Sequence, residues 1–415
     1  MRVLIVNTSE RTGGAAVAAG RLADALNDNG VKARRMVREK LSTDITVATC
    51  GSSLRKRLAF LWERLVIWLN NGFSRERLFK VSIANAGVDI THTPEFQEAD
   101  IIHLHWINQG MLSLGGIRKI LQSGKPVVWT MHDMWEATAI CHHAYDCQRY
   151  AEECGQCPFL GSHSDGDLSH RVFRRKQQML EGAQRLTFVA VSRWLAEKAR
   201  ASALIGHFPI RVIPNVLSLQ QFTIIDRIDA RTALDADVPY VIAFGAARID
   251  DPIKGFSYLA DALRLLVDSR RFRAEDIRLL LFGEVRDASI FSTLPVGYSY
   301  LGYVDDAYRL SQVYSAANAT VSSSLYETFG QTLIEAMACG STPVSFDGSG
   351  QADIISHQQN GYLARRLSVE SLAEGIAWAL TTPLDAHSLR RSVIRRYAES
   401  VVAQQYTNLY NDIMK

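Results

Sequence analysis

The stretch SSSLYETFGQTLIEAMACG, residues 322–340, joins a short apolar run, Ala319–Ser322, to residues with the spacing of a helix. A strand that passes through a loop into a helix is the repeating unit of a parallel α/β sheet. Gly330 lies where the helix would begin, and a glycine there lets backbone N–H groups approach an anion such as phosphate. Glu327 and Glu335 have seven residues between them. Carboxylates beside a phosphate site bind hydroxyl groups, although a capped surface helix with two solvated glutamates is the alternative.

The same alternation of short apolar runs and helical stretches extends along the chain in both directions. It predicts an α/β fold with parallel sheets and right-handed crossovers, in which ligands bind at the carboxyl ends of the strands. The expected strands include Val3–Val6, Ile101–Leu104, Val127–Thr130, Phe188–Val191, Val241–Phe244, Leu279–Phe282, Ala319–Ser322 and Pro343–Phe346. The expected helices include Ala15–Leu26, Tyr258–Val267 and Thr332–Ala338.

Length and composition are those of an ordinary globular protein. The 415 residues, 47% hydrophobic and 21% charged, suffice for two or three domains. We expect a first domain over 1–216, a second over 217–394, and a C-terminal helix over 395–415 that packs back on the first domain. No apolar run is long enough for a transmembrane helix. The apolar run in Met1–Asn7 is too short for a signal peptide, so we expect a cytoplasmic protein.

The net charge of +3 is unevenly distributed. Residues 32–80 contain 12 Lys and Arg and 4 Asp and Glu, a local charge of +8. Nucleic acid and an anionic membrane surface both suit such a patch. Within it, Leu54–Leu69 has apolar residues at helical spacing and a basic end, which suits a helix lying in a membrane interface. We therefore expect an anionic membrane surface, and no nucleic acid, as a partner. The alternative is a core-packed helix with a solvated basic end.

Several segments together resemble one family. The segment 322–340 resembles the E-x7-E element of the family 4 retaining glycosyltransferases. Four more segments follow the family's order: Thr12–Ala15 is similar to its Gly-rich loop, Thr130–Trp135 to its strand-end histidine, Ile213–Val216 to its inter-domain segment, and Phe244–Gly255 to its basic donor-binding loop. His105-Trp106 and the Cys-rich insert 141–157 resemble the exopolysaccharide, colanic-acid-type branch.

The resemblance implies a GT-B architecture, with two facing Rossmann-like domains and a nucleotide-sugar in the cleft between them. It implies a retaining hexosyltransferase that moves a sugar from a UDP- or GDP-sugar to a surface or exopolysaccharide glycan, lipid-linked or free. No cofactor is required for catalysis. Such an enzyme would work in the cytoplasm, peripherally on the inner face of the membrane. Two alternatives stay open: another GT-B enzyme, such as a nucleotide-sugar hydrolase or epimerase, and an inert sugar-nucleotide-binding partner.

The resemblance also implies roles for individual residues. Glu327 would hold hydroxyls of the donor sugar, His132 would contact the transferred sugar, and Arg248 and Lys254 would stabilise the charge of the leaving diphosphate. In this chain Ala247 stands directly before Arg248, where the family usually has Gly, and the gap to Lys254 is slightly longer. The donor-binding residues would be Gly13, Gly14, Asn215, Phe329, Gly330, Gln331, Thr332 and Glu335, with the ribose on Glu335. His105 and Trp106 would lie on the acceptor side.

Four of the six cysteines lie close together, at Cys141, Cys147, Cys154 and Cys157. Two thiolates separated by two residues can chelate a tetrahedral zinc ion, with His142 and His143 as spare ligands. Structural zinc, an iron–sulfur cluster, disulfides and unliganded thiols all remain open. Asp165-Gly166-Asp167 matches a metal-binding DxD pattern superficially. It follows no apolar strand, so we interpret it as a turn.

Overall fold

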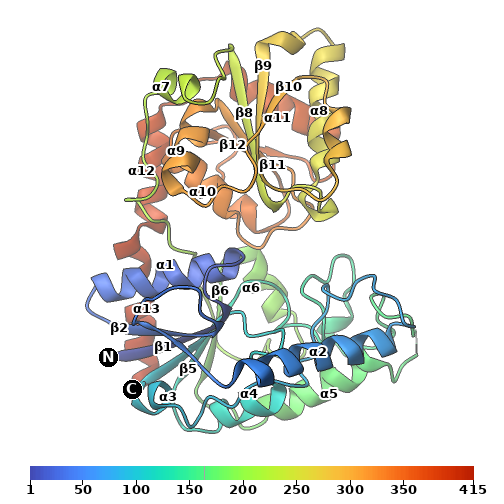
Figure 1. The fold of residues 1–415 in the computed structure, drawn as a ribbon, viewed down its shortest axis with the longest axis vertical. Coiled ribbons are helices and arrows are strands. Elements are labelled where there is room, and N and C mark those ends of the chain that lie inside the picture. Colours follow the sequence, from blue (N-terminus) through green and yellow to red (C-terminus); the bar gives the residue numbers. More distant parts are fainter. Residues whose placement is uncertain (163) are drawn as a thin grey trace. The chain divides into compact units, whose positions relative to one another are not determined.

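The computed structural model describes residues 1–162 and 164–415, and the chain divides into two compact units (Figure 1). Unit 1 comprises Met1–Val216 together with Val402–Lys415, and unit 2 comprises Leu217–Val401. The expected boundary lay near residue 217, and unit 2 begins at Leu217.

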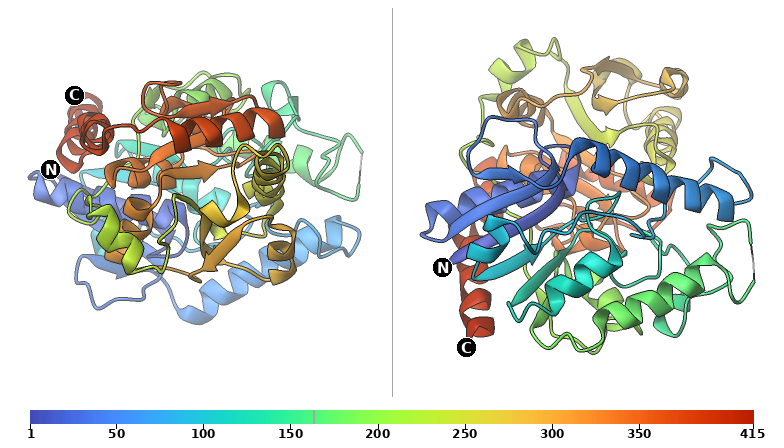
Figure 2. Two further views of the ribbon diagram at one scale, coloured as in Figure 1. Left: turned by 90° about the horizontal axis from the view of Figure 1, so that it is seen from above. Right: turned by 60° about the horizontal axis from the view of Figure 1, so that its bottom comes forward.

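Unit 1 is built on a sheet of seven strands in the order β3-β2-β1-β4-β5-β6-β7, and every neighbouring pair is parallel (Figure 2). Because the order reverses between β1 and β4, these two strands form the switch point at which ligands bind in open α/β sheets. The strands are β1 (Arg2–Ser9), β2 (Lys32–Glu39), β3 (Val47–Thr49), β4 (Ile101–Leu104), β5 (Val127–Met131), β6 (Leu186–Ala190) and β7 (Ile210–Val212). The helices are α1 (Gly14–Asp28), α2 (Ser53–Asn70), α3 (Pro94–Glu98), α4 (Leu114–Leu121), η1 (Arg149–Ala151), α5 (Leu168–Leu180), α6 (Arg193–Arg200) and α13 (Glu399–Met414).

Unit 2 repeats this plan with six parallel strands in the order β10-β9-β8-β11-β12-β13. Its switch point lies between β8 and β11. The strands are β8 (Tyr240–Arg248), β9 (Ile277–Glu284), β10 (Gly297–Tyr300), β11 (Ala319–Ser322), β12 (Thr342–Phe346) and β13 (Tyr362–Ala364). The helices are α7 (Arg227–Thr232), η2 (Pro252–Lys254), α8 (Phe256–Asp268), η3 (Ala274–Asp276), η4 (Ala288–Thr293), α9 (Ala307–Ala316), α10 (Gln331–Ala338), η5 (Gly350–Asp353), α11 (Val369–Thr381) and α12 (Ala386–Tyr397).

The apolar runs form the central strands because both faces of a parallel sheet are covered. All residues of β4, β5, β6, β11 and β12 are buried. Sequence patterning missed β2, whose sequence KARRMVRE is strongly basic. Its pairing with β1 along seven positions makes it a strand, and only Ala33, Met36 and Val37 are buried. The short strands β3, β7, β10 and β13 were missed because three or four residues carry little periodicity.

The C-terminal helix predicted over 395–415 corresponds to α13 (Glu399–Met414), but the predicted range begins too early and includes the last residues of α12. The structure has two helices there, α12 and α13, separated at Ala398, whose backbone is extended with φ −57° and ψ 151°. Leu217 N–H donates to the carbonyl of Tyr397 at 2.8 Å, and Leu217 bridges Ala398, so the backbone at the break is hydrogen-bonded to another segment. α12 belongs to unit 2, whereas Val402–Lys415 belongs to unit 1. Tyr406 and Tyr410 of α13 share a buried cluster with β1 and α1.

Candidate functional site

In unit 2 the predicted residues gather at the switch point between β8 and β11. Arg248 is the last residue of β8, Lys254 ends the turn η2 that follows, and Glu327 lies in the loop after β11. Lys254 Nζ donates to Glu327 Oε2 at 2.8 Å. Burial lowers the pKa of Lys254, but the adjacent Glu327 carboxylate outweighs it, and the pKa is raised. A fixed cation and a carboxylate thus meet at this edge of the sheet.

The two loops that carry this pair are tied together through their backbones. Gly255 has φ 66°, and a Cβ there would lie 2.0 Å from the carbonyl oxygen of Ser323. Ser323 Oγ donates to the carbonyl of Gly255 at 2.8 Å, and Leu325 N–H donates to that of Ile253 at 2.8 Å. Only glycine permits this approach, so the sequence Lys254-Gly255 positions the lysine through the backbone of its neighbour.

Helix α10 begins directly after the same loop. Its N-cap, Gly330, has φ 110° and ψ 53°, and no side chain caps the helix. The ring of Phe329 is buried edge-on against Tyr397, with centroids 5.7 Å apart, so this side chain serves packing. Residues 329–332 can therefore contact a ligand through their backbone. They lie at a helix N-terminus, where partial positive charge favours anions. Gln331 and Thr332 are half-buried in the first turn.

Glu335 lies in the second turn of α10 and is buried. Tyr314 OH donates to its Oε2 at 3.2 Å. Arg248 lies within 3.4 Å of carboxylate oxygens of both Asp250 and Asp251, and β8 has a register shift between Gly245 and Arg248. The guanidinium of Arg248 is thus held by aspartates of its own loop, whereas Lys254, six residues later, pairs with Glu327 of another loop.

In unit 1 the predicted residues follow β1, β4 and β5. Gly13 has φ 90° and caps α1, and a Cβ at Gly13 or Gly14 would meet nothing within 4 Å. Packing therefore does not require Gly14, and the absence of a side chain leaves room for a ligand at the start of α1. His105 and Trp106 follow β4, and His132 follows β5.

His105 and His132 contact each other. His105 Nδ1 is 2.8 Å from His132 Nε2, and the two rings are stacked with centroids 5.1 Å apart. Trp129 Nε1 donates to the carbonyl of His105 at 3.2 Å. Burial lowers the pKa of His132 to about 4 and that of His105 well below its ordinary value. Both rings are therefore neutral at pH 7, and one proton lies between them.

Asp133 is a hub that sequence reasoning missed. Its Oδ2 is 2.7 Å from His142 Nδ1 and accepts from Trp106 Nε1 at 2.8 Å, and its Oδ1 accepts from Trp135 N–H at 2.7 Å. Burial raises the pKa of Asp133, but the charge and hydrogen bond of His142 and the charge of His143 outweigh it and bring the pKa to about 2. His142 thus orients Trp106 through a shared carboxylate. The only sequence signal was the position of Asp133 beside a strand-end histidine.

A second buried network ties α13 to the same strands. His103 Nδ1 is 2.7 Å from Tyr410 OH, and His103 Nε2 is 2.8 Å from Thr130 Oγ1. Thr130 Oγ1 is in turn 2.9 Å from Tyr406 OH. The C-terminal helix therefore fixes the strands that carry His105 and His132.

Asn215 lies among the last residues of unit 1, after β7, and is half-buried. The residues after β8 and β11 that are predicted to bind the donor belong to unit 2. The assignment of Asn215 to donor binding stays a prediction.

The four cysteines of the insert line one small cavity of about 20 Å³. They are free thiols, and burial raises the pKa of Cys154 to about 11 and that of Cys157 to about 12. Within residues 1–162 and 164–415, no group of three or more His, Cys, Asp or Glu side chains is arranged to hold a metal ion. His142 contacts Asp133 rather than the thiols. Structural zinc stays a proposal, which elemental analysis of protein purified without chelator would test.

The DxD-like sequence forms a turn. Asp167 caps α5 by accepting from His170 N–H at 3.0 Å, and its other oxygen accepts from Cys157 N–H at 2.7 Å. Both oxygens thus serve local structure.

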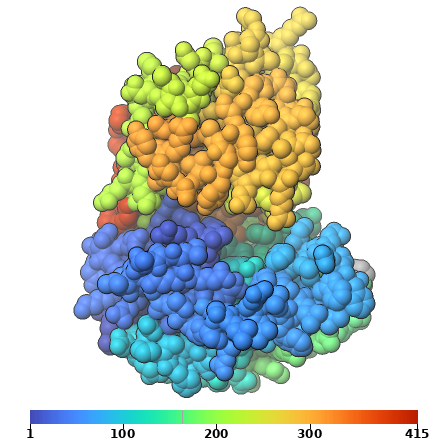
Figure 3. Space-filling model, viewed as in Figure 1, coloured from blue at the N-terminus to red at the C-terminus, as the bar shows by residue number. Residues whose placement is uncertain are grey.

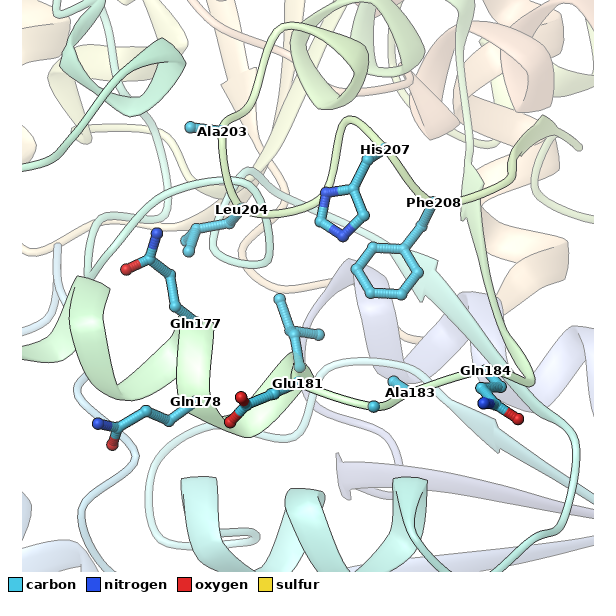
Figure 4. A pocket seen from close by; sticks show the side chains of 11 residues that line it. Gln177, Gln178, Glu181, Ala183, Gln184, Ala203, Leu204, His207 and Phe208 are labelled. Atoms are coloured by element: carbon cyan, nitrogen blue, oxygen red, sulfur yellow. The ribbon is translucent and has the colours of Figure 1, made fainter.

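A larger cavity of about 540 Å³ lies elsewhere in unit 1 (Figure 4). It is lined by the end of α5 and by the segment 203–208, from which the rings of His207 and Phe208 extend toward the cavity. It contains none of the predicted site residues.

Two family models together match most of the chain. A family model described as Glycosyltransferase Family 4 matches residues 12–221, half of the chain, and one described as Glycosyl transferases group 1 matches residues 225–399. The chain is 29% identical over 213 residues to a phosphatidyl-myo-inositol mannosyltransferase of Mycobacterium tuberculosis, covering 48% of this chain and 53% of that protein. The match thus spans about half the length of that relative. The Escherichia coli K12 protein WcaC, named as a glycosyl transferase of colanic acid biosynthesis, is 24% identical over 326 residues, 75% of each chain.

Solved structures show the same fold. A sucrose-phosphate synthase from Thermosynechococcus elongatus superposes with a TM-score of 0.69 at 19% identity, covering 99% of this chain and 98% of that one. Anabaena HepE, solved in complex with UDP and glucose, gives a TM-score of 0.65 at 16% identity, covering 99% and 100%. Two Rossmann-like units with parallel sheets and these likenesses define a GT-B glycosyltransferase fold. The chain belongs to Glycosyltransferase Family 4.

Within the described residues, no helix combines the length and the apolar character needed to cross a bilayer.

Proposed function

We propose that this chain is a retaining glycosyltransferase that moves a hexosyl group from a UDP- or GDP-sugar to a growing surface or exopolysaccharide glycan. The observation that carries the proposal is the Lys254–Glu327 pair, held at 2.8 Å beside the N-terminus of α10 at the switch point of unit 2. A nucleoside diphosphate needs cations and backbone N–H groups, and a sugar needs a carboxylate for its hydroxyls. That loop cluster offers all of these.

The proposed chemistry assigns each group a role. The bond between the anomeric carbon and the phosphate oxygen breaks, and the diphosphate leaves with the electron pair. Lys254, Arg248 and the start of α10 stabilise that charge. Glu327 accepts hydrogen bonds from sugar hydroxyls, Glu335 from the ribose. The acceptor hydroxyl adds to the same face, and its proton goes to the departing phosphate oxygen, so no side chain need act as a general base.

On unit 1, we propose that the carboxyl edge of the sheet contacts the transferred sugar and the acceptor. His132 would touch the sugar. Trp106, oriented by Asp133, offers an aromatic face, which binds the apolar face of a sugar ring. His105 would hold the ring of His132 in place through the hydrogen bond between them.

The experiment is an incubation with a panel of UDP- and GDP-sugars, with release of nucleoside diphosphate as the readout. Release from one donor should fall on the order of 100-fold in Glu327→Gln, because a preorganised contact to the reacting group is lost. The matched control is Glu374→Gln, which removes an exposed carboxylate that pairs with Arg271 elsewhere on unit 2. Equal activity of the two variants would refute the assigned role of Glu327.

The same assay separates the rival functions. A hydrolase would release nucleoside diphosphate from the donor fully without any acceptor, whereas an epimerase would convert the donor to its epimer with no net release. An inert binder would show a thermal shift with UDP or GDP and no release with any acceptor. The anomeric configuration of the product, read by NMR, tests retention.

We propose a lipid-linked acceptor on the inner face of the cytoplasmic membrane. The mycobacterial relative, named for phosphatidyl-myo-inositol, supports a lipid acceptor, and WcaC, named for colanic acid biosynthesis, supports the exopolysaccharide. An anionic membrane surface would then be a partner of the chain.

A further inference from the structure

Helix α2 lies on the face of unit 1 seen in Figure 3, and a stripe of its apolar side chains is exposed. At 100° per residue its exposed large apolar side chains fall within an arc of about 100° around the helix. Leu54 is 65% exposed and Trp62 54%. The members, called the α2 stripe below, are Leu54, Leu58, Leu61, Trp62, Leu65 and Leu69.

The opposite face of α2 is fully used by the fold. Ala59 and Ile67 are buried there, and Glu63 is completely buried. Glu63 Oε1 accepts from Ser82 Oγ at 2.5 Å and from Ile83 N–H at 2.8 Å. Because α2 packs on unit 1 through this opposite face, the packing of unit 1 does not use the α2 stripe.

Exposed apolar side chains are concentrated around this helix. Of 20 large apolar residues that are exposed among the described residues, ten lie between residues 41 and 79. Besides the α2 stripe these are Leu41, Ile45, Phe73 and Phe79. Large apolar side chains gathered on one exposed face of a helix mark an interaction site.

The charges beside the stripe indicate what covers it. Arg55 and Arg57 are exposed and lie on the two sides of the stripe, at about 100° to either side of Lys56. Lys56 points inward and donates to the carbonyl of Arg38. The whole region 32–80 carries a net charge of +8. An apolar strip flanked by arginines matches the boundary between anionic headgroups and acyl chains.

We propose that the α2 stripe and its flanking arginines dock unit 1 on an anionic lipid surface, with α2 lying in the plane of the interface. The inference rests on the proposed function, since a lipid-linked acceptor requires the enzyme at the bilayer. It adds the element that makes the contact. Apolar insertion supplies affinity, and the arginines supply preference for anionic lipid.

The test is flotation of the full chain with vesicles of phosphatidylcholine, with and without phosphatidylglycerol. Binding is expected only with phosphatidylglycerol, weakening as salt rises. Arg55→Glu with Arg57→Glu should weaken it by roughly 30-fold or more, at about 1 kcal/mol per lost basic charge. The control Arg391→Glu with Arg395→Glu reverses two exposed arginines on α12 and should bind normally. Leu58→Ser with Leu61→Ser should abolish binding at unchanged unfolding temperature, because both residues are exposed.

Equal binding to both vesicle types, or normal binding by either α2 variant, would overturn the proposal. So would concentration-dependent dimerisation that Leu58→Ser with Leu61→Ser abolishes, since a second copy would then cover the stripe. Transfer from the donor to an acceptor in solution, compared with Glu327→Gln and measured without vesicles, reports the proposed function separately, so its failure and the loss of lipid binding are distinguishable.

Discussion

Gly255→Ala should disable the proposed donor site without changing any of the residues assigned to bind the donor. The substitution leaves Lys254, Glu327 and the start of α10 unchanged, but the added Cβ would lie 2.0 Å from the carbonyl oxygen of Ser323. Ordinary contact begins at 3.4 Å, so the loops must separate by about 1.4 Å. The left-handed backbone adds about 1–2 kcal/mol of strain. A displacement of about 1 Å at a catalytic group costs on the order of 100-fold in rate, so we expect such a fall in kcat/KM.

The assay is donor turnover together with the unfolding midpoint in urea, and the matched control is Gly124→Ala. Gly124 also has a positive φ, 78°, but an added Cβ meets nothing within 4 Å. The control should lose stability from backbone strain alone and keep full activity. If Gly255→Ala turned over donor within about threefold of the native chain, well below the 100-fold expected from displacement, the loop contact would not position Lys254.

Three further predictions concern unit 1. Glu63→Ala should lower its free energy of unfolding by about 3 kcal/mol, measured in urea, because buried donors at Ser82 and Ile83 lose their acceptor; a loss below about 1 kcal/mol would contradict this. Tyr410→Phe should cost about 1–2 kcal/mol by orphaning His103 Nδ1, and an unchanged unfolding midpoint would show that α13 does not support β4. The pKa of Asp133 is lowered from 3.8 to about 2, so the stability it contributes is present above pH 3.8 and lost as pH falls towards 2. Acid titration followed by circular dichroism should show this loss, and Asp133→Asn, already destabilised at pH 7, should flatten it.

The sequence predicted the fold class well because its central strands are buried on both faces and read as uninterrupted apolar runs. It missed β2, because the basic residues of β2 interrupt any apolar pattern and the strand forms through its pairing with β1. It also placed the start of the C-terminal helix at residue 395, inside α12, since the break at Ala398 depends on a hydrogen bond from Leu217, remote in sequence.

The sequence by itself predicted where chemistry could occur. Gly13 and His132 follow strands of unit 1, Lys254 and Glu327 follow strands of unit 2, and within each sheet the carboxyl ends of parallel strands share one edge. Only the tertiary structure decided which side chains meet there. Lys254 and Glu327, 73 residues apart, form an ion pair, and Asp133 joins Trp106 to His142. The order of the strands decides such contacts. That order follows from the crossovers and from packing across the whole sheet, which no local pattern encodes.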